Sequence, residues 1–214
     1  MQTFGGDALL SRTLIVATPV TALVMLAVAR GWTDRLDRQL FARLQFAMTK
    51  PDGRPRKLGT AARDIVALGG DTLRILFVLG CMLGLIADDR IVAAAALFGV
   101  IAVARLSLFL LKRVVRRPRP DVDRQAVVTF TSSFPSGHTF MAVVTFLTAA
   151  MLIPLGMPAI LVWMAIGFAL LVSLAIGIVR VALGVHWPTD IVAGWCAAIA
   201  WTSGSLLLVD RLLH

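Results

Sequence analysis

The chain has 214 residues, of which 58% are hydrophobic, and its mean hydropathy is +0.86. Soluble domains use roughly 45–50% apolar residues, so this composition excludes a soluble globular protein and indicates an integral membrane protein. The net charge is +9, and because basic residues that flank apolar spans usually contact headgroups, we expect membrane lipids and no nucleic acid as partners.

Six apolar segments predict the architecture, since a transmembrane helix needs about 20 residues. They cover residues 14–29, 73–87, 91–111, 136–154, 159–179 and 188–209. The predicted fold class is all-α: a polytopic membrane protein with a six-helix transmembrane bundle, forming a single domain over residues 1–214. We expect the first segment to be a retained anchor, because no small-residue cleavage pattern follows it. Cys81 and Cys196 lie inside apolar segments and are expected to be packing residues.

A polar connector, residues 30–71, separates the first two spans. Its first part predicts an amphipathic helix at the membrane interface, with Leu36, Leu40, Phe41, Leu44 and Phe46 on the apolar face. A basic loop at 50–57 and a short helix at 60–68 are expected to follow. The connector either binds lipid headgroups as a solvated link or covers the entrance to a site.

Arg105 is a charge deep in the third predicted span. An unpaired arginine at this depth costs about 2.5–3.5 kcal/mol on insertion scales, so we expect its side chain to face the bundle and to pair with a carbonyl or polar side chain.

Three polar clusters flank these spans. Lys112 precedes Arg119-Pro120, Pro135-Ser136-Gly137-His138 opens the fourth span, and Arg180, His186 and Asp190 surround the junction of the fifth and sixth spans. In an antiparallel bundle, the ends of spans three and five lie on the same side as the beginnings of spans four and six. The sequence therefore predicts that all three clusters meet on one face, within residues 112–190.

The clusters contain groups suited to binding phosphate. Lys112, Arg119 and Arg180 supply an ammonium and two guanidinium groups. Ser136 is a natural helix N-cap, and Gly137 permits a close approach of the backbone to a ligand. The free amides at such a helix start, together with the helix dipole, favour an anion.

Two histidines and an aspartate supply candidate catalytic groups. Asp190 follows His186 by four residues, and Pro188 suits the first position of a helix. Asp190 can then hold one imidazole nitrogen of His186 and direct the other toward a substrate. His138 can protonate a departing oxygen. Each residue alone has an ordinary structural explanation, but membrane proteins rarely gather so many polar groups without a function.

The three clusters resemble the tripartite motif of the type 2 phosphatidic acid phosphatase superfamily, which is related to vanadium haloperoxidases. The pattern is Lys, six residues, Arg-Pro; then Pro-Ser-Gly-His; then Ser-Arg, five residues, His, three residues, Asp. The chain departs from it at Val179, where the pattern has serine. The resemblance implies that His186 forms a phosphohistidine, that Asp190 orients it, and that His138 is the acid. It also implies that phosphoryl oxygens are bound by Lys112, Arg119, Ser136, Gly137 and Arg180.

From this resemblance we expect an enzyme that needs no metal and no cofactor and removes a terminal phosphate from a phospholipid or isoprenoid (di)phosphate. Undecaprenyl diphosphate, phosphatidylglycerophosphate, phosphatidate and lipid A phosphate all fit, and the oligomeric state stays open. A phosphoryl or phospho-headgroup transferase of the same fold is one alternative. A non-catalytic lipid-phosphate carrier is another, although binding alone does not require two histidines.

The location of the site is predicted from two conflicting signals. Of the 21 basic residues, only Arg12, Arg90 and Arg211 flank the side opposite the clusters, and the positive-inside rule would make the cluster side cytoplasmic. Resemblance to bacterial family members implies the inner membrane with a periplasmic site. We favour the latter, because the charge rule weakens for long loops.

Overall fold

The computed structural model describes residues 7–48, 70–115, 117–120, 132–152 and 157–213, and within these ranges every regular element is an α-helix. The helices are α1 (Asp7–Ala29), α2 (Asp34–Met48), α4 (Asp71–Ala87), α5 (Ile91–Val114), α6 (Gly137–Leu152), α7 (Ala159–Ala182) and α8 (Pro188–Leu213). The predicted all-α class is confirmed. An apolar helix begins or ends within a few residues of each predicted boundary, except that α1 starts at Asp7, one turn before Arg12.

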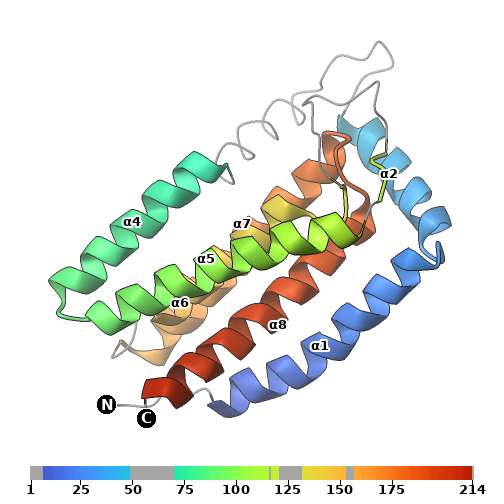
Figure 1. Cartoon of the computed structure of the whole chain (residues 1–214). Helices are drawn as coiled ribbons and strands as arrows, with labels where there is room; N and C mark the ends of the chain where they lie inside the picture. The colour runs from blue at the N-terminus through green and yellow to red at the C-terminus, as the bar shows by residue number, and fades with distance from the viewer. Residues whose placement is uncertain (1–6, 49–69, 116, 121–131, 153–156, 214) are drawn as a thin grey trace.

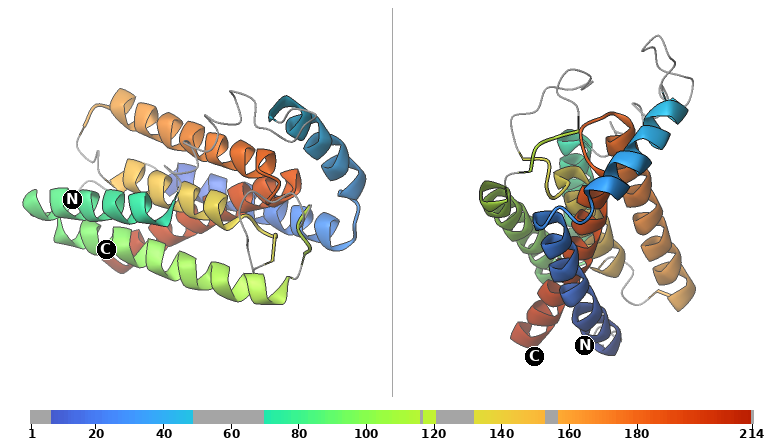
Figure 2. Two further views of the ribbon diagram at one scale, coloured as in Figure 1. Left: turned by 90° about the horizontal axis from the view of Figure 1, so that it is seen from above. Right: turned by 90° about the vertical axis from the view of Figure 1, so that its right-hand side faces the viewer.

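The long helices run side by side in alternating directions, while α2 lies across one end of the bundle (Figures 1 and 2). α1 packs mainly against α8, α6 packs against both α7 and α8, and α4 packs against α5. The α7–α8 loop and the C-terminal end of α5 lie at the same end as α2, whereas α1 begins and α8 ends at the other (Figure 1). This arrangement places the beginnings of α6 and α8 beside the ends of α5 and α7.

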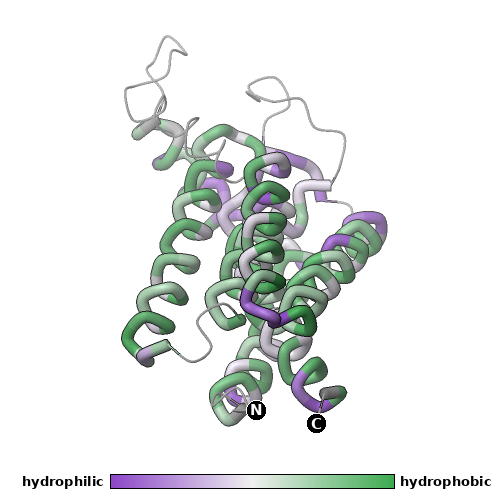
Figure 3. The backbone as a smooth tube through the Cα atoms, turned by 90° about the vertical axis from the view of Figure 1, so that its left-hand side faces the viewer, coloured by the Kyte–Doolittle hydropathy of each residue, from purple (hydrophilic) through white to green (hydrophobic). Residues whose placement is uncertain are grey.

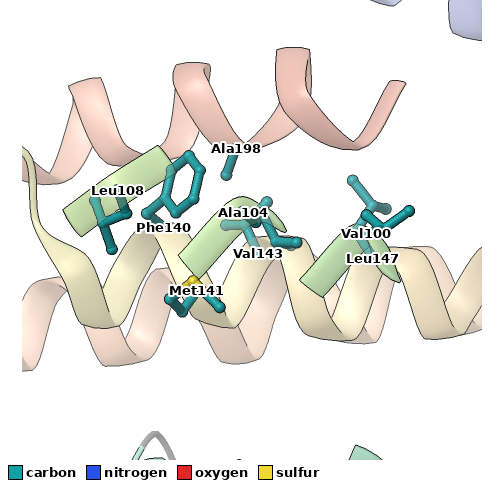
Figure 4. Close-up of a cluster of buried hydrophobic side chains, with 9 residues drawn as sticks. Val100, Ala104, Leu108, Phe140, Met141, Val143, Leu147 and Ala198 are labelled. Carbon is teal, nitrogen blue, oxygen red and sulfur yellow. The ribbon is translucent and has the colours of Figure 1, made fainter. Parts of the chain in front are cut away.

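The core is centred on α6, most of whose side chains are buried. Its apolar residues contact a row from α5 at four-residue intervals and one small residue of α8 (Figure 4). Four-residue spacing brings side chains onto one helix face, so α5 and α6 pack along their length. The cluster consists of Val100, Ala104, Leu108, Phe140, Met141, Val143, Val144, Leu147 and Ala198.

The outer surface of the bundle is apolar. Large hydrophobic side chains of α1, α4, α5 and α7 are exposed, among them Ile15 (70%), Leu83 (68%) and Phe168 (70%). Hydrophilic residues gather mainly at helix ends and turns (Figure 3). Such an extensive exposed apolar surface marks a membrane-facing protein. Four helices, α1, α5, α7 and α8, are long and apolar enough to cross a membrane by length and composition. α4 and α6 are shorter, with 17 and 16 residues, so six spans stays a prediction.

The amphipathic helix predicted in the connector corresponds to α2. Leu36, Leu40 and Phe46 are exposed on it, whereas Asp37 is 1% exposed. A helix on the surface of a soluble protein buries its apolar side chains and exposes its charged ones. Here the apolar side chains are exposed and available to lipid. The interfacial position stays a prediction, and both the basic loop at 50–57 and the helix at 60–68 lie outside the described residues.

The position of Arg105 differs from the prediction, but the predicted polar partner is present. Its side chain is 59% exposed, so the prediction that it faces the bundle interior is wrong. It nevertheless has a polar partner, because Nη2 lies 2.9 Å from Oδ2 of Asp71 in the first turn of α4. Asp71 also pairs with the buried Arg74. The three residues thus form a charge cluster that joins α5 to the beginning of α4.

Candidate active site

The three predicted clusters meet at the end of the bundle that carries α2. The backbone N–H of Ser136, just before α6, donates to the carbonyl of Asp190 in α8 at 3.0 Å. Arg119 donates from Nη1 to the carbonyl of Val185, next to His186, at 2.6 Å. A backbone hydrogen bond therefore joins the second cluster to the third, and a side-chain hydrogen bond joins the first cluster to the third. The structure brings together all eight predicted site residues, although their chemical roles stay predictions.

The first turn of α6 forms one wall of the site. Ser136 occupies the N-cap position, since its carbonyl accepts the first helical hydrogen bond, from the N–H of Phe140 at 2.9 Å. The hydroxyl of Ser136 accepts a hydrogen bond from Thr139 Oγ1 at 3.0 Å. A Cβ atom on Gly137 would lie 3.4 Å from Cε of Lys112. Glycine here lets the lysine pack directly against the helix start, whose free amides favour an anion.

Three cations surround this helix start. Lys112 donates from Nζ to the carbonyl of Ser132 at 2.9 Å, and its ammonium lies close enough to Arg119 and Arg180 for mutual repulsion. Burial lowers the pKa of the Arg119 guanidinium below its ordinary value, although Asp190 opposes this shift. Like charges held together in a partly buried site are stabilised by an anion. The arrangement is therefore electrostatically suited to a phosphoryl group.

Arg180 is the most deeply buried of these cations, with 4% of its surface exposed. Its Nε has no hydrogen-bond partner among the described residues. Val179, which replaces the serine of the family pattern, is also buried and offers no hydroxyl. A buried guanidinium N–H without an acceptor carries a desolvation cost, and a phosphate oxygen would relieve it.

His186 is placed by the turn that follows α7. Gly184 adopts a positive φ of 75°, which favours glycine, and its N–H donates to the carbonyl of Val181. This turn directs the chain back into the bundle, where the imidazole is only 1% exposed. Burial lowers the pKa of His186 to about 4, even though the nearby carboxylate of Asp190 opposes the shift. The imidazole is therefore neutral at pH 7 and has a lone pair available for attack.

Asp190 lies in the first turn of α8 and faces His186. Its Oδ2 accepts a hydrogen bond from the backbone N–H of Trp187 at 2.9 Å and lies 3.5 Å from Nδ1 of His186. The Nδ1 contact is too long for a good hydrogen bond, and such catalytic contacts often tighten only when substrate binds. Because Nδ1 faces the carboxylate, Nε2 is the nitrogen left for substrate.

His138 is half-buried in the first turn of α6. Its imidazole interacts electrostatically with Arg180 and with His186, which places the two histidines in one site. Its role as the acid that acts on the leaving group stays a prediction.

Sequence reasoning missed Arg117, Asp37 and Thr189. Arg117 bonds to both Asp37 and Asp190. Thr189 bonds to Asp37 through its backbone N–H and its hydroxyl. The proximity of Arg117 to Arg119 was a signal for the first of these. No sequence signal links Asp37 to a motif 152 residues away.

Within the described part of the chain, no group of three or more His, Cys, Asp or Glu side chains is placed to hold a metal ion. The metal-free reaction stays a prediction.

The sequence model of the PAP2 superfamily matches residues 93–213. The chain belongs to this superfamily. It is 35% identical over 164 residues to the decaprenylphosphoryl-5-phosphoribose phosphatase of Mycobacterium tuberculosis, covering 72% of this chain and 80% of the relative. A lipid A 1-phosphatase of Rhizobium etli is 31% identical over 112 residues, covering 47% of this chain and 43% of that protein.

Two solved structures share the fold. The crystal structure of a transmembrane phosphatidylglycerolphosphate phosphatase from Bacillus subtilis superposes with a TM-score of 0.79 at 21% identity, over 94% of this chain and 95% of that one. Aquifex aeolicus LpxE gives a TM-score of 0.59 at 24% identity, over 80% and 94%. The resemblance inferred from the three clusters is thus confirmed at the level of the family, and the fold is that of its membrane members.

Proposed function

We propose that this membrane PAP2 protein hydrolyses a terminal phosphate from a phospholipid or isoprenoid (di)phosphate through a phosphohistidine intermediate. The observation that carries the proposal is the neutral, buried imidazole of His186, with Asp190 on one side and the cation cluster nearby. A nucleophile beside preorganised positive charge is what phosphoryl transfer requires.

In the first step, Nε2 of His186 attacks phosphorus and the bond from phosphorus to the lipid oxygen breaks. His138 gives its proton to that oxygen, and Asp190 stabilises the charge that develops on the His186 ring. In the second step, His138 takes a proton from water, the water oxygen attacks phosphorus, and the bond to Nε2 breaks. The hydroxyl of Ser136, the amide of Gly137 and the charges of Lys112, Arg119 and Arg180 hold the phosphoryl oxygens throughout.

The lipid phosphatase activity is supported by family membership and by the names of the relatives, which act on a decaprenylphosphoryl-phosphoribose and on the 1-phosphate of lipid A. The experiment is phosphate release by purified protein in detergent. Its substrate panel includes undecaprenyl diphosphate, phosphatidylglycerophosphate, phosphatidate, a lipid A phosphate and a polyprenylphosphoryl-phosphoribose. The His186→Ala variant is the control, and activity that survives this change would exclude the mechanism. Transfer of phosphate to an added acceptor lipid instead of water would indicate a transferase.

We further propose that residues 1–214 act as one phosphatase domain with six membrane spans, in a bacterial inner membrane with the site on the periplasmic face. α1 begins and α8 ends at the side opposite the site (Figure 1), so a periplasmic site requires both of these helix ends to be cytoplasmic. A fluorescent protein fused after His214 is expected to fluoresce in the cytoplasm, whereas alkaline phosphatase at the same position is expected to be inactive. The reverse pattern would place the site in the cytoplasm.

A further inference from the structure

Asp37 of α2 is a buried charge that lies outside the three family motifs. Its side chain is 1% exposed. Oδ1 accepts a hydrogen bond from the backbone N–H of Thr189 at 2.9 Å, and Oδ2 accepts one from the Thr189 hydroxyl at 2.6 Å. Both contacts are to the beginning of α8, one residue before Asp190. A buried carboxylate is retained only when such partners compensate its desolvation.

Arg117 connects this carboxylate to the catalytic one. Its Nη2 donates to Oδ2 of Asp37 at 2.6 Å, and its Nη1 donates to Oδ1 of Asp190 at 2.7 Å. Nη1 also lies 3.0 Å from the hydroxyl of Thr189. Burial would lower the pKa of Arg117, but Asp190 and Asp37 together raise it above its ordinary value. One guanidinium fork, permanently charged, thus spans two carboxylates from α2 and α8.

These contacts fix the orientation of the Asp190 carboxylate. Oδ1 is held by Arg117, while Oδ2 accepts from the N–H of Trp187 and faces Nδ1 of His186. Rotation of the carboxylate would break at least one of the two hydrogen bonds. Arg117, by holding Oδ1, therefore determines that Oδ2 is the oxygen that faces His186.

We propose that Asp37 and Arg117 are positioning residues for catalysis: α2 holds Arg117 through Asp37, and Arg117 holds Asp190 in the orientation that directs His186 at phosphorus. The proposal rests on the function proposed above, since it gives Asp190 its orienting role. It assigns α2, which the family motifs do not include, a part in the chemistry. The competing explanation is that the Asp37 contacts merely attach α2 to the bundle.

α2 itself supplies a matched control. Asp34 lies one turn before Asp37 and approaches the same atom of Arg117, but at 3.6 Å and with 51% of its side chain exposed. Changing Asp34 to Asn removes the same charge from the same helix without touching Thr189. Because an exposed pair at this distance contributes little, Asp34→Asn should behave like the wild type.

The test compares Asp37→Asn, Arg117→Lys and Asp34→Asn with the wild type in detergent. We expect the first two variants to lower kcat roughly 10- to 100-fold, the usual effect of removing a residue that orients a functional group, with KM changed less than about threefold because the phosphate-binding cations are intact. Arg117→Lys keeps the charge but loses the fork, so it tests orientation and not charge alone. Thermal unfolding identifies a variant that fails to fold, and Arg117→Lys carries the test if Asp37→Asn does not fold.

Two inhibitors separate positioning from attachment. Orthovanadate mimics the five-coordinate phosphoryl group on the nucleophile, whereas inorganic phosphate reports ground-state binding to the cations. We expect the inhibition constant of orthovanadate to rise in step with the fall in kcat and that of phosphate to stay unchanged. Unchanged kcat in both variants overturns the proposal, and so does an equal weakening of both inhibitors with a raised KM. A wild type without vanadate-sensitive phosphatase activity refutes the proposed function itself, which distinguishes the two failures.

Discussion

Nδ1 of His186 lies 3.5 Å from Oδ2 of Asp190, four residues later and in the first turn of α8. The carboxylate opposes the effect of burial on the imidazole, yet burial dominates and lowers the pKa of His186 to about 4. The folded protein therefore keeps the imidazole neutral through the pH range in which an exposed histidine, with a pKa of about 6.5, takes up a proton.

This shift is measurable directly. The chain has three histidines, so protein labelled with ¹⁵N-histidine gives few signals, and the one lost in His186→Gln belongs to His186. We expect that signal to stay in the neutral form at pH 6. Between pH 6.5 and 4 the unfolded chain binds a proton that the folded chain excludes, so this residue's contribution to stability is complete above pH 6.5 and is lost as the pH falls toward 4. A titration midpoint at or above 6.5 would contradict the expected burial.

Replacing each of the two histidines by alanine is expected to block a different step of the reaction. His186→Ala removes the nucleophile and should abolish turnover. His138→Ala removes the acid, a change typically costing about 10²- to 10⁴-fold, but it should still form the phosphoenzyme slowly from p-nitrophenyl phosphate, whose leaving group needs no proton. Rapid-quench trapping of acid-labile protein-bound phosphate checks this. Equal labelling of both variants would argue against the assigned roles.

Chelation and vanadate distinguish this reaction from metal-assisted hydrolysis. EDTA is expected to leave the rate unchanged, because the cations of the site are proposed to supply the positive charge that stabilises the transition state. Orthovanadate should inhibit competitively with the lipid phosphate. Dialysis against EDTA followed by a phosphate-release assay measures the first effect, and a strict Mg²⁺ requirement would refute the mechanism.

Gly194 controls how closely α8 approaches the start of α6. A Cβ atom there would lie 3.1 Å from the carbonyl oxygen of Ser136, so Gly194→Ala must move the backbone beside the amide of Gly137, which is proposed to bind phosphate. We expect a fall in kcat/KM of about 10-fold or more, because small misplacements of catalytic groups can lower the rate by roughly 10²-fold.

Gly99→Ala is the matched control, because nothing lies within 4 Å of a Cβ at Gly99. Alanine is favoured over glycine by about 1 kcal/mol in a helix, so this variant should be at least as stable as the wild type and equally active. Steady-state kinetics on the two variants compares them, and equal activity would show that the close approach is not needed.

Asp71 is expected to matter more for stability than Arg105. Asp71→Asn removes an ion-pair partner from both Arg105 and the buried Arg74, and the loss of an ion pair by a buried charge is destabilising. Arg105→Leu leaves the Arg74 pair intact and replaces an exposed side chain, so its effect should be small. Thermal unfolding in detergent ranks the two variants, and a larger loss from Arg105→Leu would reverse this assignment.

The apolar segments could be located from the sequence because each one is a local pattern. Hydrophobic runs predicted α1, α5, α7 and α8, and the apolar run that follows Pro135 predicted the shorter α6. Helix ends were less accurate: α1 extends seven residues further toward the N-terminus than expected, because an arginine near a helix end can extend its charge toward the membrane surface. The exposure of the Arg105 side chain was also not predictable, because its partner Asp71 belongs to another helix.

The sequence by itself determined the convergence of the eight candidate site residues, because motif spacing and an antiparallel order of helices are properties of the chain; their roles stay a prediction. Only the tertiary structure decided that Asp37 is buried against the beginning of α8 and that Arg117 joins it to Asp190. On α2, Asp37 is one charge among several, and nothing local separates it from Asp34. Burial and hydrogen-bond partners are set by which helix packs where, and that depends on contacts between residues far apart in the chain.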